Sequence, residues 1–187
     1  MMSDSLGRSF RTSSCAAVAT AAVLLVVGLV ACRRTAAPVI GPTRAVEIRD
    51  WTISVPADAR QSKTDGADFT VTYFEFPGLQ ATLGVYEGAH PRLFAGEKTK
   101  VSRTEDKIGG RKVVWDLWTE TKGGKQTSHA ETQLVSTVFQ LEGAPTRYVE
   151  QLHLFLSAPD EPTAEAIRSI ARTLQQTGTP PPPPPPK

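Results

Sequence analysis

Hydrophobic and polar residues alternate over much of the chain after residue 45, a pattern typical of half-buried β-strands. A first strand is expected over 46–56, bulged at Arg49 and Asp50, because apolar residues occupy alternate positions on both sides of that pair. The polar stretch 57–68 predicts a loop or a short helix. This part of the chain therefore contributes one strand to the expected sheet.

The same alternation next predicts two β-hairpins. Branched and aromatic runs over 69–86 surround a turn at Pro77 and Gly78, and a second alternating region over 111–141 turns at the glycine pair 123–124. Residues 87–110, between the hairpins, predict a loop with a single helical turn. The strand 147–156 is apolar on both faces towards its end, so we expect it in the middle of the sheet.

A C-terminal amphipathic helix is the clearest element. Asp160 is its expected N-cap and Gly178 its expected end, while Glu165, Arg168 and Arg172 should face solvent. One apolar stripe should pack on the sheet: Ala164, Ile167, Ile170, Ala171 and Leu174. Strands followed by this helix predict an α+β fold, an antiparallel sheet meander covered by helices.

The N-terminal region has the features of an export signal. Arg8 and Arg11 precede an uncharged run of 16 residues, 16–31, which is shorter than the roughly 20 residues of a membrane-spanning helix. The run ends in Leu29, Val30, Ala31 and Cys32, which resemble the lipobox of bacterial lipoprotein precursors. The resemblance implies cleavage between Ala31 and Cys32 and attachment of lipid to the Cys32 sulfur. A plain membrane anchor over 15–32, or a secreted protein whose cysteine is coincidental, are the alternatives.

The expected organisation is therefore a signal peptide (1–31), a lipidated cysteine with a flexible tether (32–45), one domain (46–176) and a disordered proline-rich tail (177–187). The tail contains seven consecutive prolines, which favour an extended polyproline II conformation of about 3.1 Å per residue. It is either a low-complexity solvated end, a spacer or a docking segment for an aromatic groove.

Charge and cysteine content exclude several function classes. Removal of the leader takes away two arginines and one aspartate and changes the net charge from +2 to +1. A near-neutral body does not suit nucleic acid as a partner. Cys15 would leave with the leader and Cys32 would become a thioether, so the processed chain would have neither disulfides nor thiol chemistry.

No pattern in the sequence predicts a catalytic residue, a metal ligand or a cofactor. The three histidines His90, His129 and His153 lack the local spacing of a metal site. Ser128, His129 and Asp116 could be drawn as a triad, but neighbouring strand residues point to opposite faces. His153 is expected to be a core histidine bonded to a backbone or hydroxyl group, and a functional role would need a nearby carboxylate.

The segments WTISVPADA (51–59) and IGGRKVVW (108–115), with a last strand that leads into an amphipathic helix, resemble the PsbP/DcrB-like group. The resemblance covers about 46–176. It implies an α/β/α sandwich and a binding or assembly-supporting role.

These features together predict a lipid-anchored, non-catalytic binding or envelope assembly and maintenance module on the extracytoplasmic face of a bacterial membrane. Its partners would be the membrane, through acyl chains on Cys32, and an envelope protein. The outer membrane is favoured over the inner one, because Arg33 follows the cysteine where inner-membrane retention is associated with aspartate. A small envelope hydrolase and a ligand sensor, each with a site assembled from distant residues, are the alternatives.

Overall fold

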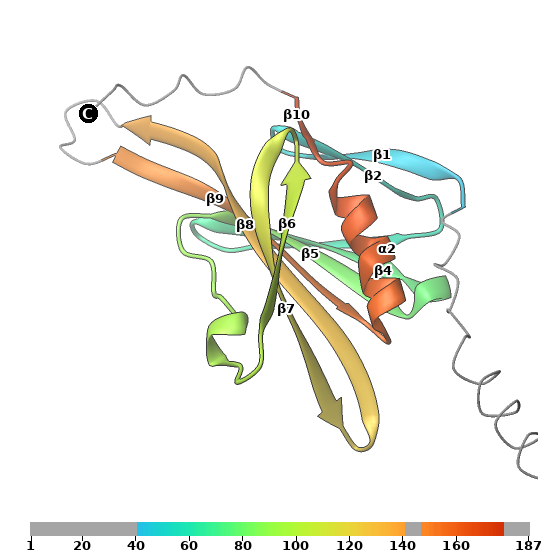
Figure 1. Ribbon diagram of the computed structural model, residues 1–187. Helices are drawn as coiled ribbons and strands as arrows, with labels where there is room; N and C mark the ends of the chain where they lie inside the picture. The colour runs from blue at the N-terminus through green and yellow to red at the C-terminus, as the bar shows by residue number, and fades with distance from the viewer. Residues whose placement is uncertain (1–40, 141–146, 178–187) are drawn as a thin grey trace, which may run out of the picture. The chain divides into compact units, whose positions relative to one another are not determined.

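The computed structural model describes residues 41–140 and 147–177, and this part of the chain is predominantly β-structure. A small antiparallel sheet has the order β1-β2-β10, formed by β1 (Thr43–Ile48), β2 (Trp51–Pro56) and β10 (Gln175–Gln176). A larger antiparallel sheet has the order β3-β4-β5-β9-β8-β7-β6 (Figure 1). Its strands are β3 (Arg60–Asp65), β4 (Phe69–Phe76), β5 (Ala81–Gly88), β6 (Ser102–Ile108), β7 (Arg111–Lys122), β8 (Lys125–Gln140) and β9 (Arg147–Ala158).

The helical elements are short. The 3₁₀ turns η1 (Pro77–Leu79) and η2 (Ala95–Glu97) lie in loops, and α2 (Glu161–Ala171) follows β9. Asp160 caps α2 as expected, since its side chain accepts a hydrogen bond from the Thr163 amide at 2.8 Å. No helix within 41–140 or 147–177 is long and apolar enough to cross a membrane.

One core joins the two sheets and the helix. The expected stripe of α2 is buried and packs against β9, β5, β2 and β8. Ile167 lies in the same cluster as Ile53 of β2, Leu83 of β5 and Leu154 of β9, all of which are fully buried. Strand β9 is the fourth of seven in the large sheet, so its expected central position is confirmed.

The expected α+β sandwich with helices over the sheet, and the α/β/α sandwich implied by the PsbP/DcrB-like resemblance, are wrong. The small sheet and α2 cover one face of the large sheet. On the other face the described chain has only the loop 89–101, which contains η2. Two of the extra strands, β3 and β6, come from polar segments in which no apolar alternation marks them.

Three segments of the chain form different elements from those that the sequence predicted. Residues 46–56 form two strands, because Arg49 and Asp50 make a two-residue hairpin turn, with Arg49 at φ 44°, rather than a bulge. The stretch 57–68 contains β3, and 87–110 contains β6. Both are edge strands whose side chains are mostly exposed on both faces. Their sequences therefore lack the alternation of apolar and polar residues that a strand with one buried face shows.

Candidate functional site

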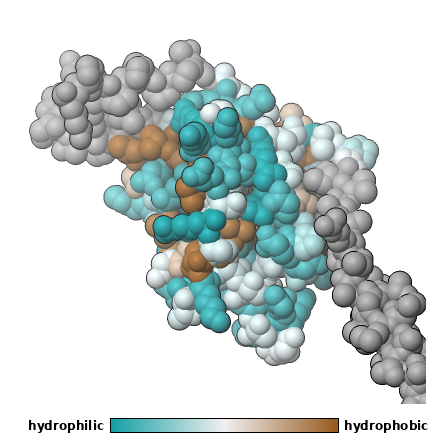
Figure 2. Space-filling view, in the orientation of Figure 1, coloured by the Kyte–Doolittle hydropathy of each residue, from teal (hydrophilic) through white to brown (hydrophobic). Residues whose placement is uncertain are grey.

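The open face of the large sheet, defined here as the face turned away from α2, exposes large apolar side chains. Tyr73, Val114 and Val135 are 37%, 49% and 46% exposed on it. Figure 2 shows hydrophobic patches interrupting an otherwise polar surface. Val114 and Val135 lie on the neighbouring strands β7 and β8, whereas Tyr73 lies on β4, across the sheet, where it lines a pocket.

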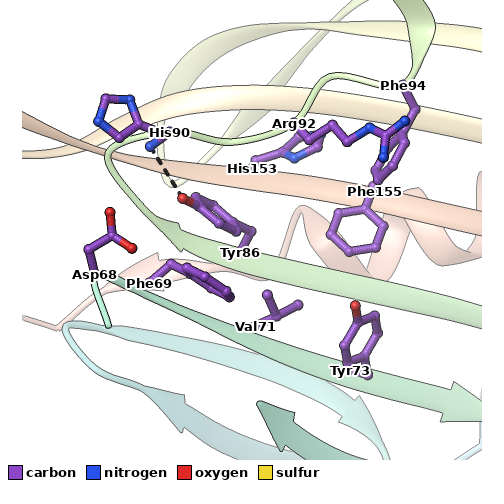
Figure 3. A pocket seen from close by; sticks show the side chains of 10 residues that line it. All are labelled: Asp68, Phe69, Val71, Tyr73, Tyr86, His90, Arg92, Phe94, His153 and Phe155. Atoms are coloured by element: carbon purple, nitrogen blue, oxygen red, sulfur yellow. Dashed lines mark hydrogen bonds between the residues drawn. The ribbon is translucent and has the colours of Figure 1, made fainter. Parts of the chain in front are cut away.

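A pocket of about 420 Å³ lies on this face, beside the loop 89–101 (Figure 3). We call it the aromatic pocket. Its apolar walls are Phe69, Val71 and Tyr73 from β4, Tyr86 from β5, Phe155 from β9 and Phe94 from the loop. Asp68, His90 and Arg92 supply polar groups at its border, and His153 also lines it.

The rings of the pocket hold one another in place. Phe69 and Tyr86 are stacked with centroids 5.6 Å apart, while Tyr73 and Phe94 each meet Phe155 edge-on, at 5.9 and 5.5 Å. The His90 amide donates a hydrogen bond to the Tyr86 hydroxyl at 3.2 Å. Such contacts fix ring orientation before a ligand arrives.

Two glycines of β5 make room for these rings. A Cβ on Gly84 would collide with the Phe155 ring, and a Cβ on Gly88 would come within 2.6 Å of the Tyr86 hydroxyl oxygen. The aromatic side chains therefore lie directly over bare backbone, as glycine in a strand allows. Neither glycine has a positive φ, so space rather than backbone conformation requires them.

A buried histidine–carboxylate pair lies below the pocket. His153 Nε2 is 3.0 Å from Glu131 Oε2, and the two residues are 1% and 3% exposed. Glu131 also accepts hydrogen bonds from the backbone amides of Phe94 at 2.9 Å and Ala95 at 2.7 Å. The carboxylate thus ties the loop 89–101 to β8 and places Phe94 in the pocket wall.

Opposing effects act on the pKa of Glu131. Burial alone would raise it, but the hydrogen bonds from His153, Phe94 and Ala95 favour the charged form and hold the pKa below its ordinary value. Glu131 is therefore ionised at neutral pH, which strengthens its hold on the loop.

A second pocket of about 290 Å³ lies on the other side of Phe94 and Phe155. Trp118 and His129 stack there with centroids 5.3 Å apart. Trp118 Nε1 donates to Glu120, and Lys98 forms an ion pair with the same carboxylate at 2.7 Å. Burial lowers the pKa of His129, so its neutral form is favoured.

The structure separates most residues that the sequence analysis considered together. His90 lies at the border of the aromatic pocket and His153 at its base, whereas His129 lies in the second pocket. Asp116 is paired with Arg103 at 2.8 Å instead of with His129. Within the described ranges, no group of three His, Cys, Asp or Glu side chains could hold a metal ion.

Some expectations fall outside the described residues, and two were wrong. The lipobox residues Leu29, Val30, Ala31 and Cys32 and residues 178–187 of the tail lie outside them. The expectation that Gly178 ends the C-terminal helix was wrong, because α2 ends at Ala171 and β10 follows it. His153 was expected to bond to a backbone or hydroxyl group, but its partner is Glu131. Sequence reasoning missed this pair because the two residues are on neighbouring strands, and only the register of β8 with β9 brings them together.

No protein-family model matches the chain, and no curated protein matches it significantly. Among solved structures, the chain is similar to a crystal structure of a protein from Bacteroides thetaiotaomicron, with 11% identity over 74% of this chain and a TM-score of 0.42. The match covers 49% of that chain, so the present chain spans about half the length of the protein that it resembles.

Proposed function

We propose that this chain is a lipid-anchored, non-catalytic binding module of the bacterial cell envelope, and that the aromatic pocket is its ligand site. The proposal combines the lipobox-like leader with the single observation that carries the binding role. That observation is a pocket of about 420 Å³ whose aromatic walls are fixed by mutual contacts on an incompletely covered sheet face. Pockets of this size and composition suit small ligands.

The walls indicate the chemistry of the ligand. Aromatic faces bind flat or ring-shaped apolar groups, and the polar border can orient a charged substituent. Arg92 is the exposed cation of that border: its side chain is 73% exposed, lies 6.0 Å from the Phe94 ring centroid and pairs with Glu97 at 3.1 Å. A ring with an anionic substituent fits both features.

The pocket can be tested with naphthalene-2-sulfonate as the probe. The acylated chain in lipid nanodiscs should bind this anion in saturation-transfer NMR, relative to empty nanodiscs. Tyr73→Ser should weaken binding about five- to tenfold, because it removes one aromatic wall. Val114→Ser is the matched control, since Val114 is exposed on the same face but does not line the pocket. Equal affinities of the two variants would show that the probe does not bind in the aromatic pocket.

The anchor has its own test. When the full chain is expressed in a bacterial host, intact mass should show cleavage between Ala31 and Cys32 and added acyl mass. Cys32→Ser should abolish both, because the lipid is attached through sulfur, whereas Cys15→Ser should change neither. Acyl mass on the Cys32→Ser protein would overturn the lipoprotein assignment. Fractionation of the acylated chain between the two membranes would test the outer-membrane location that we favour.

The histidine–carboxylate pair supports a second candidate, a small hydrolase in which His153 is the general base and Glu131 orients it. The distance of 3.0 Å and the place below the pocket favour this reading. However, Glu131 already holds two loop amides, which gives the pair a structural role. The rates of p-nitrophenyl acetate hydrolysis by the wild-type chain and by His153→Gln distinguish the hydrolase from the structural role. We expect equal rates, and a slower rate for His153→Gln would support the hydrolase.

A further inference from the structure

The second pocket shares two walls with the aromatic pocket. Phe94 and Phe155 line both pockets, and their rings meet edge-on with centroids 5.5 Å apart. Figure 3 shows the two rings next to each other at one end of the aromatic pocket. Both side chains are only partly buried, so part of each ring faces solvent. The two pockets are therefore neighbouring hollows that a single pair of rings separates.

The sheet register explains the hollow on the far side of this pair. Thr82 of β5 lies opposite Ser157 of β9, and Ser157 in turn lies opposite His129 of β8. Cross-strand partners share one face of a sheet, and all three residues line the second pocket. The short side chains of Thr82 and Ser157 thus leave a floor between the Phe155 ring and the stacked rings of Trp118 and His129.

The loop 89–101 contributes to both pockets in chain order. Arg92 lies at the border of the aromatic pocket, Phe94 lines both pockets, and Lys98 lines the second. Glu131 accepts hydrogen bonds from two backbone amides of this loop, one of them that of Phe94. The loop is therefore fixed to the sheet at the point where the two pockets meet, and both pockets are present together.

The second pocket suits an uncharged group. Lys98 Nζ lies 2.7 Å from Glu120 Oε1, so the positive and negative charges at this pocket balance each other. Burial lowers the pKa of His129, which favours the neutral form of the imidazole. An uncharged ring can pack against the Trp118 and His129 rings there, while the proposed function assigns the anionic substituent to Arg92, at the border of the aromatic pocket.

We propose that the two pockets are subsites of one site, whose ligand is an elongated molecule with an anionic ring at one end and an uncharged ring at the other. This inference rests on the proposed function, because the aromatic pocket holds the anionic ring. Tyr73 on β4 and Trp118 on β7 are four strand positions apart, which is about 19 Å across the sheet. Two rings joined by a short link fit within this span, and the link passes over the exposed edges of Phe94 and Phe155.

The test compares two anions, naphthalene-2-sulfonate and 6-(p-toluidino)naphthalene-2-sulfonate, which differ by one uncharged ring group. The acylated chain in lipid nanodiscs is labelled with 3-fluorotyrosine and 5-fluorotryptophan, and Tyr73→Phe and Trp118→Phe assign the two resonances. Equilibrium dialysis gives the free concentration of each anion. The shorter anion should shift the Tyr73 resonance alone. The longer anion should shift both resonances with one midpoint and bind about tenfold more tightly, because it buries a second ring.

A variant that fills the second pocket separates the two subsites. In Ser157→Leu, the larger side chain occupies the floor of the second pocket, and Ser157 does not line the aromatic pocket. The affinity for the longer anion should fall about tenfold, to that of the shorter anion, whose own affinity should not change. Gln151→Leu is the matched control, since Gln151 lies on the same face of β9 and lines neither pocket.

Three outcomes would overturn the two-subsite proposal. Equal affinities for the two anions, with the Tyr73 resonance shifted alone, would show that the second pocket takes no part, and the proposed function would survive. Different midpoints for the Tyr73 and Trp118 resonances would show that two molecules bind separately. Equal losses of affinity in Ser157→Leu and Gln151→Leu would place the second ring outside the second pocket. If neither anion shifts the Tyr73 resonance, the proposed ligand site fails as well.

Discussion

Two buried glutamates on opposite faces of the large sheet differ in what surrounds their carboxylates. Glu131 on the open face is bonded to His153 and two loop amides, and its pKa is lowered. Glu87 on the core face is equally buried, at 3% exposed, yet no described residue donates a hydrogen bond to its Oε2. Burial raises its pKa to about 7, although Arg49 acts in the opposite direction. Hydrogen bonding, rather than burial alone, decides which of the two is charged.

Glu87 should therefore make the protein less stable as pH rises. Its folded pKa of about 7 lies above the unfolded value of 4.5, so its contribution is fully present below pH 4.5 and is lost as pH rises to about 7. The shift corresponds to roughly 3 kcal/mol. Glu87→Gln removes the titration, so the variant should gain about that much relative to wild type between pH 4.5 and pH 8, as measured by urea midpoints. A constant difference between the two chains across this range would contradict the prediction.

At the scale of elements, the sequence predicted the strands and the helix that are buried on one face or on both faces. The alternation in β4, β5 and β7, the apolar β9 and the stripe of α2 all reflect core contacts, and the structure confirms these elements. The edge strands β3 and β6 were missed because water covers most of their side chains. The pocket could not be predicted either, since its walls come from three strands and a loop that only the sheet register brings together.

The helix α2 shows the same limit within one element. Arg168 was expected to face solvent, but it is 6% exposed, with its guanidinium 2.9 Å from Glu161 and 2.5 Å from Glu165. The long aliphatic stem allows an arginine to be buried while its head meets exposed carboxylates. Helical periodicity alone assigns such a residue to the solvent face, although its aliphatic stem can be buried.

We expect a graded loss of stability along α2. Ile170→Ala should lower the free energy of unfolding by about 2–5 kcal/mol, because Ile170 is in the core. Arg168→Ala should cost about 1–2 kcal/mol through lost packing and hydrogen bonds. Arg92→Ala, at an exposed site, is the control and should stay within about 0.5 kcal/mol. Urea midpoints of the three variants measure the series, and an Arg168→Ala midpoint equal to that of the control would restore the solvent-facing assignment.

At the scale of the whole described fold, the large sheet ends in two strands that could each pair with another chain. Both carry charges: Lys63 and Asp65 on β3 form an ion pair at 3.1 Å, and Arg103 and Lys107 lie on β6. Charged edge strands oppose further strand addition, and this protection matters for a sheet whose open face already exposes apolar residues.

Removal of charge from one edge should therefore cause association. The double variant Lys63→Val with Asp65→Val leaves the net charge unchanged but presents an apolar edge on β3, so we expect dimers or larger species in sedimentation analysis of the detergent-solubilised chain. The control is Arg92→Val with Glu97→Val, which removes an exposed ion pair from the loop 89–101, away from every strand edge. Association of both variants to the same extent would point to general hydrophobicity, whereas association of the β3 variant alone assigns it to the unpaired backbone of that strand.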